Sequence, residues 1–181
     1  MMPSSRTRES QQFLVIGIQY YLTGRQATLC GLMPVSGNLV HHAIEMILKA
    51  GLLERFDSAE LKKDFHHRLP KIWSQFKNLA ADSSLGQFDE LITEIHKWAE
   101  IRYPYFPRGK ALAMTAEILR FPRTIVQPDD DLYTINLEAV DEFMKVLMNV
   151  LQVNPEFLKT VMLRQESRDL YERENRHKIW P

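Results

Sequence analysis

The chain is 181 residues long, with 45% apolar and 25% charged residues, which excludes the composition of an intrinsically disordered protein. At this length folding buries roughly 70% of the surface of the open chain, so one core suffices without disulfides or metals. The 23 lysines and arginines balance the 23 aspartates and glutamates, which argues against a protein that coats nucleic acid through an overall basic charge.

The N-terminal segment predicts one long helix. Apolar residues recur at helical spacing from Gln11 to about Leu32, and Pro34 ends the pattern. The apolar run 13–18 is too short for a signal-peptide core or a membrane span, so we expect a cytoplasmic protein. The one cysteine, Cys30, excludes an intramolecular disulfide, and its apolar neighbours predict a buried thiol.

Three further helices follow, each with apolar residues three and four positions apart and a polar residue able to cap its start. Their expected extents are 36–52, 58–76 and 84–103. Pro70 interrupts the second of these three, so we expect a kink or a break just before it. Ser84 and Gln87 have the spacing of a capping box and predict the start of the last one.

The stretch from Arg108 to Ile135 is the least regular part of the chain, because it holds two prolines and an acidic run. We expect a long excursion there, with a short helix over 110–119 and a small hairpin made from the β-leaning pieces 124–126 and 132–135. A helix from Asn136 and a last, strongly charged helix from Asn154 onward close the chain.

These elements predict an all-α fold. We expect an up-and-down bundle of four to five main helices, with an irregular excursion after the fourth and a charged C-terminal helix. The chain is expected to form a single helical domain, with a bundle core at 10–107, an irregular insertion at 108–135 and closing helices at 136–180.

One polar row is a candidate site. His41, Glu45 and Lys49 are spaced by four and lie on one face of their helix. They form either a solvated row of local ion pairs or a ligand-contacting row. A third zinc ligand could come from another histidine, but the HExxH spacing is absent. We therefore assign neither a metal nor a cofactor.

Two other segments carry polar groups of interest. His66, His67 and Arg68 form a cationic cluster, in which at most one of the two histidines should face the interior because adjacent helix positions point about 100° apart. Arg102 and Tyr103 begin a proline-ordered aromatic exit from the fourth helix. That exit is either a structural terminator or a stacking surface for a base or a partner.

Three segments, in this order, resemble HEPN domains (higher eukaryotes and prokaryotes nucleotide-binding). Leu39–Ala50, LVHHAIEMILKA, resembles the family's LLHQAxEKxLKA helix. Lys62–Trp73 resembles the following K-x-x-G-H-D-L-x-x-L element and places His67 on the family histidine. Ile101–Pro104 matches the ARYP segment that closes the next helix. The resemblance covers about residues 10–107.

HEPN domains are helical bundles, usually dimeric, and include RNases, partners of minimal nucleotidyltransferases in toxin–antitoxin pairs, and stand-alone proteins. The resemblance implies nucleotide or RNA binding, a homodimer and, in the toxin–antitoxin case, a nucleotidyltransferase partner. It does not carry catalysis. The R-x4–6-H signature is absent, since Arg173 and His177 have three residues between them, and Arg68 replaces the aspartate after the family histidine. The insertion 108–135 is also longer than in compact members.

Our leading hypothesis is a HEPN-like helical protein that binds a nucleotide, an RNA end or a partner protein, with no assigned catalytic residue and no membrane association. The expected binding residues are His41, Glu45, Lys49, His67, Arg68, Arg102 and Tyr103. One alternative is a metal-independent RNase or toxin–antitoxin component, with a histidine as general acid/base and an arginine stabilising phosphate charge. The other is a purely structural or interaction protein.

Overall fold

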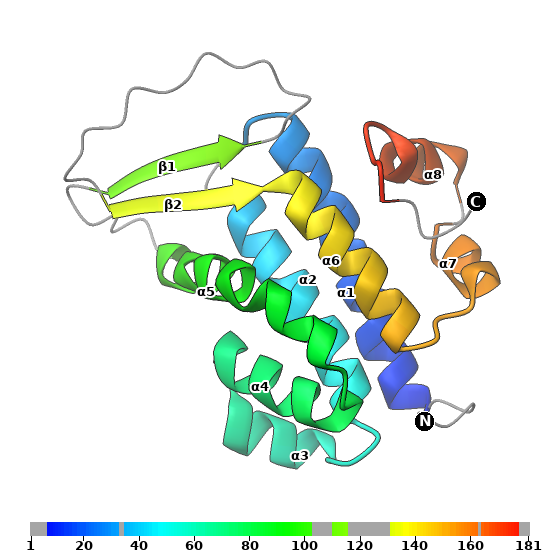
Figure 1. Ribbon diagram of the computed structural model, residues 1–181. Coiled ribbons are helices and arrows are strands. Elements are labelled where there is room, and N and C mark those ends of the chain that lie inside the picture. Colours follow the sequence, from blue (N-terminus) through cyan, green and yellow to red (C-terminus); the bar gives the residue numbers. More distant parts are fainter. Residues whose placement is uncertain (1–6, 33–34, 103–109, 116–130, 163, 178–181) are drawn as a thin grey trace.

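The computed structural model describes residues 7–32, 35–102, 110–115, 131–162 and 164–177, and helices dominate it (Figure 1). The helices are α1 (Arg8–Leu29), α2 (Val35–Leu52), α3 (Ser58–Glu60), α4 (Leu69–Ala80), α5 (Asp89–Lys97), α6 (Leu137–Val150), α7 (Pro155–Val161) and α8 (Gln165–Glu172). Shorter helical turns are η1 (Leu61–Phe65), η2 (Ser83–Phe88) and η3 (Trp98–Arg102), and two strands are β1 (Lys110–Thr115) and β2 (Asp131–Asn136). The all-α prediction is confirmed.

The long helices α1 and α2 form an antiparallel pair with a close approach (Figure 1). A Cβ on Gly17 would lie 2.6 Å from Ile47 Cγ1 and 3.2 Å from the Ala43 carbonyl oxygen, so only glycine permits this distance between the helices. The helix α6 joins the pair through a hydrogen bond from Tyr21 on α1 to Asp141.

On its other side, α2 contacts α4, α5 and η3. A Cβ on Gly37 would lie 2.0 Å from the ring of Trp98, which is fully buried against the start of α2. The helix α2 therefore lies between two layers of the bundle, and thirteen of its eighteen residues are buried.

The segment after α2 breaks where the sequence predicts. Asp57 and Glu60 form a capping box that starts α3, and η1 continues as a short π-helical turn. His66 then adopts φ 47° and ψ −122°, which ends the helical path. Pro70, in the first turn of α4, cannot donate a backbone hydrogen bond and fits this restart. The break before Pro70 is confirmed.

The predicted capping box at Ser84 and Gln87 is wrong. The side chain of Asp82 instead accepts a hydrogen bond from the Ser84 backbone nitrogen, and the residues that follow form the 3₁₀ turn η2 before α5 begins at Asp89. A carboxylate two residues earlier satisfies the free backbone donor first, because aspartate is a strong capping acceptor.

The prediction of a short helix over 110–119 is also wrong for its first six residues, and the predicted hairpin is not tested, because its first piece lies outside the described residues. The first six residues of 110–119 form β1, which pairs in parallel with β2 in the register Lys110↔Asp131 to Thr115↔Asn136. Pairing with a neighbouring strand overrides the helix propensity of alanine, leucine and methionine. The β-leaning piece at 132–135 lies in β2, whereas 124–126 and the rest of 116–130 lie outside the described residues.

The C-terminal part is charged and helical, as predicted, but not continuous. The helix α7 ends at Val161, and α8 starts afresh at Gln165 beside α1. The predicted burial of Cys30 is wrong, because this residue follows the last turn of α1 and its side chain is exposed. Among the described helices, none combines the length and apolar character needed to span a membrane.

Candidate functional site

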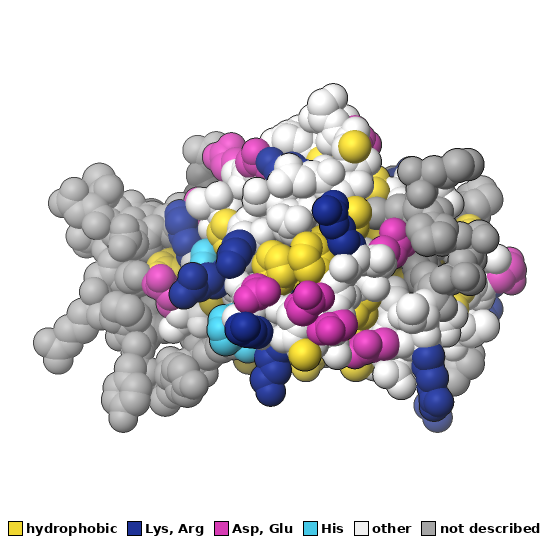
Figure 2. Space-filling view, turned by 90° about the horizontal axis from the view of Figure 1, so that it is seen from below, with side chains coloured by type: hydrophobic (Ala, Val, Ile, Leu, Met, Phe, Trp, Pro, Cys, Tyr) yellow, Lys and Arg dark blue, Asp and Glu magenta, His cyan; other side chains and the backbone are white. Residues whose placement is uncertain are grey.

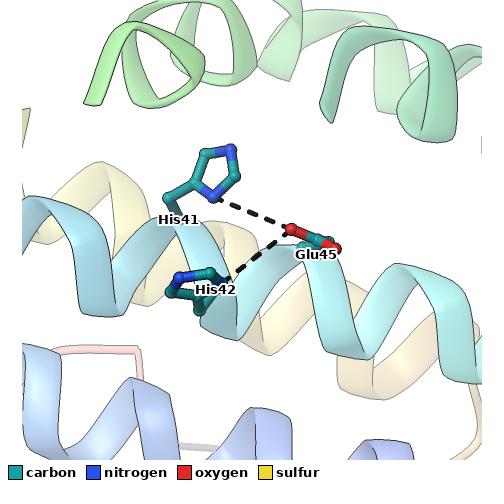
Figure 3. A group of neighbouring side chains, drawn as sticks. All are labelled: His41, His42 and Glu45. Atoms are coloured by element: carbon teal, nitrogen blue, oxygen red, sulfur yellow. Dashed lines mark ion pairs between the residues drawn. The ribbon is translucent and has the colours of Figure 1, made fainter. Parts of the chain in front are cut away.

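The carboxylate of Glu45 lies at the centre of a group of basic side chains. Glu45 is fully buried, and its Oε1 accepts hydrogen bonds from Lys49 Nζ at 2.7 Å and from His67 Nδ1 at 2.9 Å. The Nδ1 atoms of His41 and His42 each lie 3.9 Å from Glu45 Oε2 (Figure 3). We call these five residues the Glu45 cluster. It brings together four of the seven expected binding residues.

The polar row of α2 is not a wall of an open groove. His41 and Glu45 are 0% exposed and Lys49 is 6% exposed, because α2 is covered by helices on both sides. The expected solvent-lining position of these three residues is therefore corrected. His67, with its side chain 59% exposed, connects the buried carboxylate to the surface.

The backbone turn at His66 builds this connection. Its carbonyl oxygen accepts a second hydrogen bond from Lys49 Nζ, at 2.7 Å. A positive φ is uncommon for a residue with a β-carbon, and such strain persists only where surrounding contacts hold it. The turn directs the His66 carbonyl and the His67 ring toward the same buried ion pair, while the His66 side chain stays exposed. This agrees with the expectation that at most one of the two rings contacts the interior.

The electrostatics of Glu45 fix the state of its histidine partner. Burial alone would raise the pKa of Glu45, but the hydrogen bonds and charges of Lys49 and His67 together lower it below the ordinary value. An ionised carboxylate only accepts hydrogen bonds, so the Nδ1 atom of His67 carries the proton. The Nε2 atom of His67 is then the ring nitrogen left for a ligand or a proton transfer.

Two further histidines lie in this neighbourhood: His42, which the sequence did not indicate as a binding residue, and His96, which it offered only as one of three possible third zinc ligands. His42 is partly exposed, and its ring packs 5.4 Å from that of Tyr20. His96 on α5 stacks on His41 with ring centroids 6.0 Å apart. The His42–Glu45 spacing of three residues was a readable signal, since positions i and i+3 share a helix face. The contact from α5 depends on tertiary packing and had no local signal.

Basic residues flank His67 in the chain. Lys62, Lys63 and Arg68 are exposed on the same short stretch, and Figure 2 shows lysine and arginine side chains beside histidines, with acidic side chains next to them, on the lower face. Lys71 Nζ donates to the Asp64 carbonyl oxygen. The stretch is therefore locally basic, although Asp64 interrupts it, in a chain whose formal net charge is zero.

Two of the expected binding residues are not placed. The side chain of Arg102 and the whole of Tyr103 lie outside the described residues, so their part in the site stays a prediction. Two surface pockets, of about 390 and 420 Å³, are found elsewhere, one between α5 and α6 and one beside the start of α1. Neither of these two pockets is lined by a residue of the Glu45 cluster.

A second buried charge cluster joins α1, α6 and the C-terminal segment. Arg25, 0% exposed, pairs with Asp141 at 3.0 Å and donates to the Leu170 carbonyl oxygen at 2.9 Å. The Tyr21 hydroxyl donates to Asp141 at 2.5 Å. Burial raises the pKa of Asp141 despite the opposing charge of Arg25, and burial followed by the charge of Asp141 raises that of Tyr21. We call these three side chains the Arg25 cluster, which the sequence did not predict.

Comparison of the chain with protein-family profiles, with curated proteins and with solved structures found no match in any of the three.

Proposed function

We propose that the protein is a HEPN-like helical binding protein that holds the phosphate group of a nucleotide or of an RNA end at the exposed side of the Glu45 cluster. One observation carries the proposal: a buried, ionised carboxylate fixes the ring of His67 at the surface. The bound Nδ1 leaves Nε2 to a ligand, and Arg68 is the next residue. An imidazole and a guanidinium from consecutive exposed residues can supply two donors to a terminal phosphate.

The charge distribution supports a small phosphate ligand over a long nucleic acid. The patch of Lys62, Lys63 and Arg68 is local, and the chain as a whole is neutral. Long nucleic acids are bound by neutralising many phosphates, which makes affinity fall steeply with salt. Two or three contacts to one phosphate give a shallow salt dependence. We therefore expect binding of mononucleotides and of phosphorylated RNA ends, with little gain from added length.

The HEPN resemblance adds support from the sequence. The helix that supplies Glu45 and the segment that supplies His67 are two of the three segments that resemble the family. A homodimer and, in the toxin–antitoxin case, a nucleotidyltransferase partner are implied by the same resemblance and belong to this proposal. Light scattering of the purified chain tests the dimer, and a strictly monomeric mass would remove that part.

Calorimetric titration with a short RNA, with and without a 5′-phosphate, tests the proposal. The parent should bind the phosphorylated RNA at least about tenfold more tightly, a difference of about 1.4 kcal/mol. The double variant His67→Ala, Arg68→Ala should lose this preference. A matched control, Arg164→Ala with Arg173→Ala, removes two exposed cations from another face and should retain it. Equal affinity of the parent for both RNAs would refute the proposal.

A second candidate function is RNA cleavage, favoured by the hydrogen bond between His67 and Glu45. A carboxylate that orients an imidazole is the arrangement that prepares a histidine as a general base. Because the R-x4–6-H signature is absent, we rank RNA cleavage second to phosphate binding. Cleavage of labelled RNA by an EDTA-treated sample between pH 6 and 8, abolished in His67→Ala, would favour RNA cleavage over binding alone.

A further inference from the structure

Beyond the phosphate contact, α2 itself presents three metal-ligating side chains to one point. One ligand atom from each of His41, His42 and Glu45 can be chosen so that all three lie within 4.8 Å of one another. Figure 3 shows the two imidazoles one above the other beside the carboxylate, each with one nitrogen joined to it by a dashed line. No residue from a distant part of the chain is needed, because the three follow the spacings i, i+1 and i+4.

The separations are close to those of a bound ion. Each histidine Nδ1 lies 3.9 Å from Glu45 Oε2, which is too long for a hydrogen bond. Ligands about 2.0–2.1 Å from a tetrahedral zinc ion lie roughly 3.4 Å apart. Small rotations of the two imidazoles would close the difference, and His42, which is partly exposed, has room for one.

The two oxygens of the Glu45 carboxylate face different partners. Glu45 Oε1 holds Lys49 and His67 at 2.7 and 2.9 Å, whereas Oε2 is the oxygen that faces His41 and His42. Hydrogen bonds to the other oxygen of a ligating carboxylate orient it for a metal. The positive charge of Lys49 opposes a dication, so it limits the affinity of the site.

The donor set selects the kind of ion. Two imidazole nitrogens and one carboxylate oxygen suit zinc, copper, nickel or cobalt, whereas calcium and magnesium prefer oxygen ligands alone. Burial of His41 and Glu45 limits competition from water, and the partly exposed His42 leaves a route of entry. The ring of His96, stacked on His41, and the ring of Tyr20, tilted against His42, limit the imidazoles to small rotations.

We propose that His41, His42 and Glu45 bind one divalent first-row transition-metal ion, with zinc the best fit. Two imidazole nitrogens and Glu45 Oε2 would be the protein ligands, and water or a ligand oxygen would complete the coordination. This site uses Glu45 Oε2, whereas the phosphate contact uses Arg68 and the ring of His67, which Glu45 Oε1 holds.

The test is a titration of the full chain, freed of tags and of bound metal, with cobalt followed by its visible absorption and with zinc followed by calorimetry. We expect one ion per chain. His42→Ala should weaken binding at least about 100-fold, or about 2.7 kcal/mol. The matched control His177→Ala removes an imidazole outside the cluster and should bind as the parent does. His42→Gln, which keeps the side-chain bulk, serves in case the alanine variant does not fold.

Two outcomes would overturn the proposal: a parent that binds no stoichiometric ion, or a folded His42 variant that binds as tightly as the parent. The single variant Arg68→Ala separates this proposal from the proposed function. It should weaken the preference for phosphorylated RNA and keep the metal, because the hydrogen bonds that hold Glu45 Oε1 come from Lys49 and His67. A folded Arg68→Ala variant that loses the metal as well would show that the ion does not lie at His41, His42 and Glu45, which would also overturn the proposal.

Discussion

The protein buries two groups of charged side chains, and they differ in what surrounds them. The Arg25 cluster is sealed: Arg25 and Asp141 are 0% and 2% exposed, and their contacts run between α1, α6 and the C-terminal segment. Glu45 is as fully buried as Arg25, but the side chains of His67 and His42 connect the Glu45 cluster to the surface. Both are compensated ion pairs. Only one of them has a partner that a ligand can touch.

This difference assigns different roles to similar chemistry. A fully buried ion pair contributes little more stability than apolar residues of the same shape would. Removing only one of its two partners is strongly destabilising, because the other charge is left buried and uncompensated. Such a pair therefore specifies how α1, α6 and the C-terminal segment fit together. A pair that holds a histidine at the surface, beside a backbone turn with a positive φ, supports the binding site that we propose. Four substitutions can break or sharpen this contrast.

The largest effect is expected from Arg25→Met. The variant leaves the carboxylate of Asp141 buried without its cation, and the loss of stability should be about 3–5 kcal/mol. Urea denaturation measures it. Lys77→Met is the matched control, because Lys77 pairs with Asp89 at the surface and should cost less than about 1 kcal/mol. Equal losses in the two variants would show that the buried pair has no special role.

Glu45→Gln should cost about 2 kcal/mol, less than Arg25→Met, because a glutamine oxygen still accepts a hydrogen bond and only charge compensation is lost. In this variant Lys49, whose side chain is 8% exposed, also keeps its hydrogen bond to the carbonyl oxygen of His66. The exposed control is Glu156→Gln, whose partner is Lys159. A loss for Glu45→Gln as large as that for Arg25→Met would mean that this cluster is as structural as the other.

The raised pKa of Tyr21 predicts a dependence on alkaline pH. The pKa of Tyr21 in the folded state lies above the ordinary value. Its contribution to the free energy of unfolding is therefore complete below the ordinary pKa and is lost as the pH rises toward the folded-state pKa. The free energy of unfolding should fall by up to about 1.4 kcal/mol per pH unit above pH ~10. Tyr21→Phe should flatten this slope, whereas Tyr20→Phe should preserve it. An unchanged slope in Tyr21→Phe would contradict the sealed environment.

The smallest effect on stability is expected from His67→Ala, about 1 kcal/mol or less, since the side chain is 59% exposed and Lys49 still compensates Glu45. The same variant should lose the preference for phosphorylated RNA. His177→Ala is the control for both measurements. A large loss of stability in His67→Ala, with binding unchanged, would reverse the roles that we give to the two clusters.

The sequence predicts the helices well where the signal is local. The periodicity of α1 and α2, the break before Pro70 and the caps at Asn136 and Asn154 all depend on neighbouring residues. The parallel pairing of β1 with β2 does not, because it joins segments 21 positions apart. The helix propensity of the alanine, leucine and methionine residues in β1 therefore predicts a helix where a strand forms.

The candidate site divides in the same way. The i, i+4 spacing of Glu45 and Lys49 made their contact predictable, but their burial follows from the central place of α2 between two layers. The contact between Arg25 and Asp141 spans 116 positions and involves no motif, so single-sequence reasoning could not find it. Deciding which of two ion pairs reaches solvent requires the packed structure.

We propose that His67 presents an imidazole nitrogen to a phosphate. Nitrogen NMR of the labelled histidine rings tests this contact directly. Titration with a 5′-phosphorylated dinucleotide should shift the Nε2 resonance of His67, identified by its loss in His67→Ala. The resonances of His177 should stay in place. A His67 ring whose nitrogens do not move at saturating ligand would contradict the account.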